Sequence, residues 1–209
     1  MSNHCFELEG EKLLLLPERG IYWESKKILI VSDLHLGKAG HFRKHGIPIS
    51  RKIHLTDLHI LESLIQKHRP DTVILLGDLF HSFENSEWKD FLQFIEVYDW
   101  LSFVLVEGNH DILTEYPEKL KVTPILEIPP FSFSHIYEPT SYFNLSGHIH
   151  PGISVRGKGR QSLTMPCFYF SKNHGILPAF GQFTGFKKIR PGKDDVVFGI
   201  ADETVIELT

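Results

Sequence analysis

Five short clusters of polar residues punctuate this chain of 209 residues, and each contains side chains that can bind a divalent metal. In chain order they are Asp33-Leu34-His35, Gly77-Asp78, Gly108-Asn109-His110-Asp111, His135 and Gly147-His148-Ile149-His150. Carboxylate, imidazole and amide ligands together suit Mn, Fe, Co or Zn. The two cysteines, Cys5 and Cys167, match no cysteine-based spacing for structural zinc. The clusters therefore predict a transition-metal site of mixed ligands.

The clusters hold more ligands than one ion needs. Seven side chains have the required chemistry: Asp33, His35, Asp78, Asn109, His135, His148 and His150. If Asp78 bridges, they provide four protein ligands at each of two ions. Two ions about 3.5 to 4 Å apart can clamp both the attacking and the leaving oxygen of an in-line displacement at phosphorus. The chemistry expected is hydrolysis of a phosphate ester.

Each cluster follows an apolar stretch that we expect to form a β-strand. The five stretches are Ile28–Ser32, Thr72–Leu76, Phe103–Val106, Phe131–Ser134 and Phe143–Leu145. Ligands of open α/β sheets bind outside the carboxyl ends of the strands, so the five clusters should converge. Alternation along an extended backbone would point Asp33 and His35 to one side, and likewise His148 and His150. The connection from His135 to Phe143 is short for a helical crossover, so an extended loop or an antiparallel pairing is expected there.

Two amphipathic helices are expected between the early strands. One stripe comprises Leu55, Leu58, Leu61, Leu64 and Ile65, and the other comprises Trp88, Phe91, Leu92, Ile95 and Tyr98. Further strands are expected at Lys12–Leu16, Leu163–Phe170, Val196–Ile200 and Val205–Leu208. The pattern predicts an α/β fold, a sandwich of two mixed sheets flanked by helices, in a single domain over residues 1–209.

Composition and charge narrow the class of protein. With 42% hydrophobic and 23% charged residues, the chain is neither disordered nor a coiled coil. Glu7, Glu9 and Glu11 stand where a signal peptide would be basic, and no apolar run is long enough for a membrane span. We expect a cytoplasmic protein with no membrane association.

The net charge of -4 conceals two stretches without any acidic residue. Leu34–Thr56 carries five Lys or Arg and Thr140–Lys193 carries eight. If both stretches fold onto one face, that face is cationic and suits nucleic acid. The alternative is two separate solvated surfaces.

The order of the five clusters resembles the calcineurin-like metallophosphoesterases, whose motifs are D-x-H, G-D, G-N-H-D, a lone H and G-H-x-H. The resemblance assigns one ion to Asp33, His35, Asp78 and His150, and the other to Asp78, Asn109, His135 and His148. It implies that the nucleophile is a water or hydroxide between the ions. It also makes His110 the catalytic imidazole, positioned by Asp111.

Within that superfamily, the stretch of residues 33–48 is similar to the bacterial ligase-associated DNA-damage-response endonucleases, the small group called PdeM. Gly147–Pro151, Met165–Phe168 and Leu177–Phe186 are similar to the same group. The resemblance implies a phosphodiesterase that acts on DNA with two divalent ions, Mn favoured over Fe, Zn or Co. It also implies DNA ligase and helicase as functional partners.

Candidate substrate-binding residues follow the first and second clusters: Lys38, His41, Arg43, Lys44 and His81. The first four lie in a basic stretch suited to phosphate contacts, and His81 is expected beside the ligands or facing the substrate. Phe42 is available for base stacking, whereas apolar neighbours favour the core for Phe168 and Phe180.

Two other functions compete with a DNA nuclease. A small-molecule phosphoesterase acting on nucleotide-type esters would use the same metal chemistry, with the basic stretches incidental. A non-catalytic interaction module is disfavoured because the full set of ligands and His110 are present.

Overall fold

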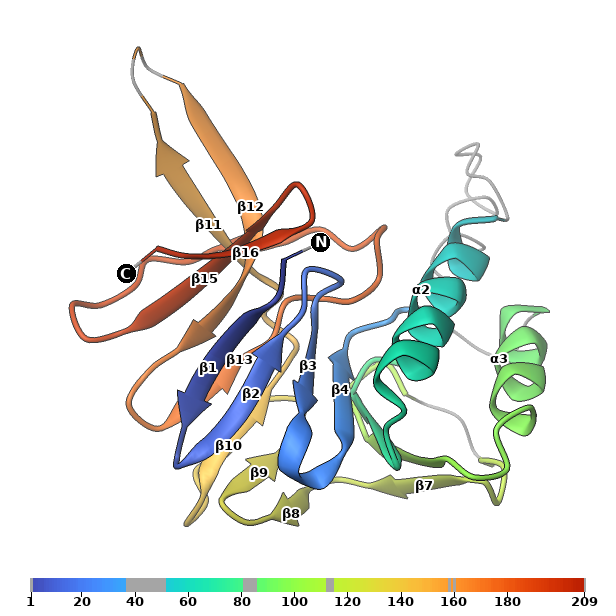
Figure 1. Cartoon of the computed structure of the whole chain (residues 1–209). Coiled ribbons are helices and arrows are strands. Elements are labelled where there is room, and N and C mark those ends of the chain that lie inside the picture. The colour runs from blue at the N-terminus through green and yellow to red at the C-terminus, as the bar shows by residue number, and fades with distance from the viewer. Residues whose placement is uncertain are drawn as a thin grey trace.

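Two β-sheets packed face to face, with two helices on the outer face of the first sheet, form the body of the protein (Figure 1). The computed structural model describes residues 2–36, 52–80, 86–111, 115–157, 159 and 161–208. The predicted α/β sandwich of two mixed sheets is confirmed.

The first sheet has seven strands in sequence order. They are β1 (His4–Leu8), β2 (Glu11–Leu15), β3 (Gly20–Trp23), β4 (Ile28–Ser32), β5 (Thr72–Leu76), β6 (Ser102–Val106) and β7 (Leu120–Thr123). A short 3-10 turn, η1 (Glu24–Lys26), precedes β4. Strands β1 to β4 pair antiparallel, and β4 to β7 pair in parallel. The carboxyl ends of β4, β5 and β6 therefore lie side by side.

The second sheet has nine strands, with β14 and β8 at the two ends of its main order, β14-β11-β12-β13-β10-β9-β8. The strands are β8 (Leu126–Ile128), β9 (Phe131–Phe133), β10 (Phe143–Ser146), β11 (Pro151–Arg156), β12 (Ser162–Phe170), β13 (His174–Ile176), β14 (Lys187–Lys188), β15 (Val196–Ala201) and β16 (Thr204–Glu207). Strand β15 pairs with β12 and β16.

Strands β9 and β10 run parallel, so the antiparallel alternative for the connection after His135 is wrong. Residues 134–142 join them as an irregular segment without a helix, which confirms the extended loop. The carboxyl ends of β9 and β10 consequently point the same way.

Alternating side chains of the first sheet divide between two hydrophobic cores. Leu29 and Val31 of β4 belong to the core that the helices cover. Ile28 and Ile30 belong to the core between the two sheets, which also contains Phe168. Because neighbouring side chains of a strand point to opposite faces, a sheet covered on both sides needs this uninterrupted apolar sequence.

The helices are α2 (Lys52–His68) and α3 (Ser86–Glu96). Leu58, Leu61, Leu64 and Ile65 are buried as the apolar stripe predicts. Leu55 is an exception, because 39% of it is exposed. Tyr98 is buried but lies beyond the end of α3. None of the helices in the described part of the chain is long and apolar enough to cross a membrane.

Candidate functional site

The five polar clusters meet at the carboxyl ends of strands β4, β5, β6, β9 and β10. Six of the seven predicted ligands form two groups whose potential ligand atoms lie within 4.8 Å of one another: Asp33, His35 and His150 in one, and Asp78, His135 and His148 in the other. This is the division that the family resemblance implies, apart from the bridging position of Asp78.

In the first group, Nε2 of His150 lies 3.1 Å from Oδ1 of Asp33 and 3.3 Å from Nε2 of His35. Ligand atoms about 2.1 Å from one ion are themselves about 3.0 to 3.4 Å apart in octahedral or tetrahedral geometry. The three side chains therefore already have the spacing that a shared metal ion imposes.

The second group is centred on His135, which is 3% exposed. Its Nε2 lies 3.3 Å from Oδ1 of Asp78, 3.2 Å from Nδ1 of His148 and 3.1 Å from Oδ1 of Asn109. Asn109, the seventh predicted ligand, thus joins this group. Nδ1 of His135 faces the carbonyl oxygen of Leu76 at 3.5 Å, and a proton on Nδ1 leaves the Nε2 lone pair for a metal.

The expected alternation of the paired ligands is wrong. Asp33, His35, His148 and His150 all have positive φ angles, of 54°, 50°, 65° and 49°, so none of them continues an extended strand. The left-handed backbone sends His148 to the second group and His150 to the first. Asp33 and His35 do share a group, but the left-handed backbone brings them there and strand alternation does not. Such conformations cost about 1 to 3 kcal/mol each and are typical of functional sites.

Two glycines allow the backbone to approach the ligands. Gly77 has a φ of +73°, and a Cβ on it would overlap the imidazole ring of His135. A Cβ on Gly147 would overlap Oγ of Ser32 and lie 2.5 Å from Oδ2 of Asp33. Any larger residue at either position would displace a ligand.

Backbone hydrogen bonds hold the two carboxylates in place. The N–H of His148 donates to Oδ2 of Asp33 at 3.1 Å, and the hydroxyl of Ser32 also contacts that oxygen. The N–H of His110 donates to Oδ1 of Asp78 at 3.0 Å. Each carboxylate is therefore oriented by the loop that follows a different strand, and these hydrogen bonds link four of the five clusters in two pairs.

The pKa values show that the site favours positive charge. Burial alone would raise the pKa of Asp78, but the hydrogen bond and charge of His135 and the N–H of His110 lower it to about 2. Burial lowers the pKa of His135, but Asp78 and Asp33 outweigh burial and raise it. Burial, with the charge of His135, lowers the pKa of His148. The carboxylates thus favour positive charge at His135, and a divalent cation would supply such charge.

His110 and Asp111 lie beside the two groups. The side chain of His110 is 43% exposed, its Nε2 lies 4.0 Å from Oδ2 of Asp78, and its ring centre is 6.0 Å from that of His35. The buried carboxylate of Asp111 accepts hydrogen bonds from the N–H groups of Phe80 at 3.1 Å and Gly108 at 2.9 Å. Asp111 therefore fixes the loop that carries His110.

The five predicted substrate-binding residues lie outside the described residues: Lys38, His41, Arg43, Lys44 and His81. The same holds for Phe42. Phe168 and Phe180 are fully buried, which confirms that they belong to the core.

A segment that we had not placed at the site, residues 177–182, supports the first ligand cluster. The N–H of Phe180 donates to the carbonyl of Ser32 at 2.7 Å, and the N–H of Gly181 donates to the carbonyl of Asp33 at 3.3 Å. Arg19 donates in turn to the carbonyl of Ala179 at 3.3 Å. The sequence signals for this segment are its glycine- and proline-containing run and the similarity of Leu177–Phe186 to the ligase-associated endonucleases.

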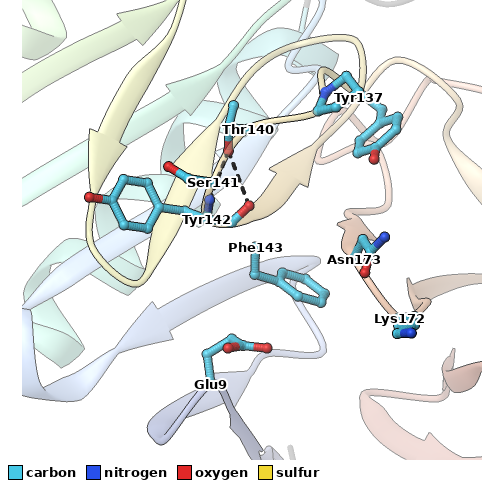
Figure 2. A pocket seen from close by; sticks show the side chains of 9 residues that line it. Glu9, Tyr137, Thr140, Ser141, Tyr142, Phe143, Lys172 and Asn173 are labelled. Atoms are coloured by element: carbon cyan, nitrogen blue, oxygen red, sulfur yellow. Dashed lines mark hydrogen bonds between the residues drawn. The ribbon is translucent and has the colours of Figure 1, made fainter.

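A polar concavity elsewhere is separate from this site. Figure 2 shows it lined by Glu9, Thr140, Tyr142 and Lys172, with Phe143 at its wall. Phe143 begins β10, whereas His148 follows the end of that strand, so the concavity lies toward the opposite end of β10. The hydroxyl of Thr140 is already hydrogen-bonded to the backbone of Tyr142, at 3.1 and 3.2 Å.

Known proteins are similar to this chain in sequence or in fold. A crystal structure of Pseudomonas putida nuclease MPE has 29% sequence identity, a TM-score of 0.84, and coverage of 99% of this chain and 100% of that one. An Arcobacter nitrofigilis protein named "Probable glycerophosphodiester phosphodiesterase GpdQ" is 31% identical over 84 residues. That match spans 40% of this chain and only 29% of the relative.

The family model named Calcineurin-like phosphoesterase matches residues 26–195, a range that contains all five clusters. The ends of strands β4, β5, β6 and β10 bring together carboxylates and imidazoles from distant parts of the sequence. The end of β9 adds His135, which lies at the centre of the second ligand group. The chain belongs to the calcineurin-like phosphoesterase family.

Proposed function

We propose that the protein is a dinuclear metal-dependent phosphodiesterase that cleaves DNA. The observation that carries the proposal is the pair of adjacent ligand groups, each already at metal-ligand spacing. The likeness to a nuclease over nearly the whole of both chains supports a nucleic-acid substrate.

One ion would be held by Asp33, His35 and His150, the other by Asn109, His135 and His148, with Asp78 between them. Mixed oxygen and nitrogen donors suit Mn, Fe, Zn or Co, and the resemblance to the ligase-associated endonucleases favours Mn among them. When bound, such ions supply Lewis acidity, which lowers the pKa of water and stabilises negative charge on a phosphoryl group.

The residues of the chain supply the rest of the chemistry. His110, half exposed and 4.0 Å from Asp78, can donate a hydrogen bond to a phosphoryl oxygen and a proton to the leaving oxygen. Asp111 maintains the loop geometry that places this imidazole. No side-chain nucleophile is required.

The biological setting that we propose is DNA repair in the cytoplasm, with a DNA ligase and a helicase as functional partners. It is supported by the similarity of residues 33–48 and 177–186 to the ligase-associated endonucleases. The acid-free stretches of the sequence agree with a polyanionic substrate.

A small-molecule phosphodiesterase is the second candidate, because one relative carries the name of a glycerophosphodiester phosphodiesterase. This activity would need the same ligands but no extended contact with nucleic acid.

The test compares three substrates with Mn, Zn or Mg: bis-p-nitrophenyl phosphate, p-nitrophenyl phosphate and labelled DNA. We expect metal-dependent hydrolysis of the diester and of DNA, with DNA cleavage weakening steeply as salt rises. Diester hydrolysis without DNA cleavage would favour the second candidate. No metal-dependent hydrolysis of any of the three would refute the proposed phosphodiesterase.

A further inference from the structure

The edge strand β14 runs directly past the first ligand group. Strand β14 pairs in parallel with β11, with Pro151 opposite Lys187 and Gly152 opposite Lys188. The N–H of Lys187 donates to the carbonyl of His150 at 2.9 Å, and the N–H of Ile189 donates to that of Gly152 at 2.9 Å. Lys187 is therefore tied to the backbone of a predicted metal ligand.

This edge carries positive charge that is not neutralised within the described part of the chain. Arg156, Lys187, Lys188 and Arg190 are all exposed. The ion pairs formed among described residues include none of these four. Residues 140–193 contain no acidic residue, and the nearest acidic residues along the chain are Glu138 before this range and Asp194 after it. Exposed cations with no ion pair among the described residues, close to a phosphoryl-transfer site, attract further phosphates.

Two exposed aromatic rings accompany these cations. Phe183 and Phe186 are 45% and 43% exposed, in a protein whose other phenylalanines in the described sheets are largely buried. The ring of Phe186 lies against Gly152, where a Cβ would come within 2.8 Å of its Cγ. The absence of a side chain at Gly152 thus lets an aromatic ring rest on the strand that follows His150.

We infer that Lys187, Lys188, Phe183 and Phe186 form a binding surface for single-stranded nucleic acid that leads the strand into the metal centre. The lysines would contact phosphates outside the scissile one, and the rings would stack on unpaired bases. A duplex keeps its base faces hidden, so the exposed rings favour a single strand. The inference rests on the proposed phosphodiesterase function and adds to it the polymer that the enzyme holds.

The test measures kcat/KM of the manganese-loaded enzyme on oligothymidylate and on bis-p-nitrophenyl phosphate in the same buffers. In the variant K187A/K188A, we expect oligothymidylate cleavage to fall about tenfold at 0.1 M salt, while hydrolysis of the small diester is unchanged. In the same variant, the slope of log kcat/KM against log salt for oligothymidylate should be shallower by about 1.4, because two phosphate contacts are lost. Phe186→Leu should also lower oligothymidylate cleavage roughly tenfold, without changing the salt slope.

The matched control is K26A/K67A, two exposed lysines that lie before the amino ends of β4 and β5, away from the metal centre. It should behave as the unmodified protein. Wild-type cleavage and salt slope in K187A/K188A would overturn the surface while leaving the phosphodiesterase intact. Equal losses on a duplex and a single strand in Phe186→Leu would overturn the stacking. An enzyme inactive on the small diester would instead refute the proposed function itself.

Discussion

At the scale of single residues, two buried carboxylates dominate the site. Asp33 is fully buried and Asp78 is 2% exposed, and each faces imidazole nitrogens at 3.1 to 3.3 Å. Buried negative charge is costly unless cations or hydrogen bonds compensate it. The backbone N–H groups of His148 and His110 compensate part of this negative charge. Metal ions bound to the two carboxylates would compensate the rest.

Asp78 is the residue whose loss should affect both ions. Replacing it with Asn removes the negative charge and one ligand oxygen, so we expect metal content to fall below two ions per chain and turnover to drop at least 10²-fold. Metal analysis after dialysis, together with hydrolysis of the diester, measures both. Asp202→Asn is the control, because Asp202 is exposed and also has a positive φ, of 44° against 47° for Asp78. Two retained ions in Asp78→Asn would refute the bridge.

His110 should matter for turnover and not for metal binding. Its imidazole contacts the site from the exposed side, so His110→Ala should lower kcat by roughly 10² to 10⁴-fold with two ions retained. His59→Ala, which removes an imidazole that is 75% exposed on α2, should leave kcat unchanged. Unchanged turnover in His110→Ala would remove this residue from the mechanism.

At the scale of elements, the sequence predicted most reliably the strands that are buried on both faces. The bounds of β4 and β5 match because each strand has four consecutive apolar residues and is followed by a polar cluster. Seven strands were missed: β1, β3, β7, β8, β11, β13 and β14. Strand β1 includes His4 and Glu7 and alternates in exposure, and β11 begins with a proline, so neither has the continuous apolar run of a central strand.

The turns at the ends of the strands explain why the destinations of His148 and His150 were not predictable from alternation. Their positive φ angles depend on contacts such as the one between the N–H of His148 and Asp33, which lies 115 residues away. Pattern reasoning finds that ligands follow strands, but tertiary hydrogen bonds decide which ligand joins which ion.

Segment 177–182 offers a test of how the elements hold the site. Arg19 donates to the carbonyls of Ala179 and Gly181, and the N–H of Gln182 donates to buried Asp57 at 3.1 Å. Arg19→Met should lower the free energy of unfolding by roughly 1 to 3 kcal/mol, because these charge-assisted hydrogen bonds are lost. Urea unfolding measures the effect. The control Arg156→Met, at an exposed position, should change the free energy of unfolding by less than about 0.5 kcal/mol. Equal stability of both variants would show that Arg19 does not support the segment.

At the scale of the whole molecule, the packing of the two sheets determines which of the two cysteines can react. Cys167 on β12 is fully buried, and burial raises its pKa to about 12, whereas Cys5 on β1 is exposed. A thiol with a raised pKa is almost entirely protonated near pH 8 and does not react as a nucleophile. We expect a thiol reagent to label one cysteine in the folded protein and two after denaturation. Rapid labelling of both in the folded protein would contradict this packing of β12.

The whole-molecule arrangement also explains how far the function was predictable. The sequence supports the chemistry because the ligand types and their positions after strands are local features. The proposed substrate surface depends on β14 lying beside His150, a contact between segments 37 residues apart that no local pattern encodes.

Anomalous scattering from crystals grown with manganese would show whether two ions bind side by side among these ligands. The account predicts two anomalous peaks per chain, one among Asp33, His35 and His150 and the other among Asp78, Asn109, His135 and His148. A single peak, or peaks away from these residues, would contradict it.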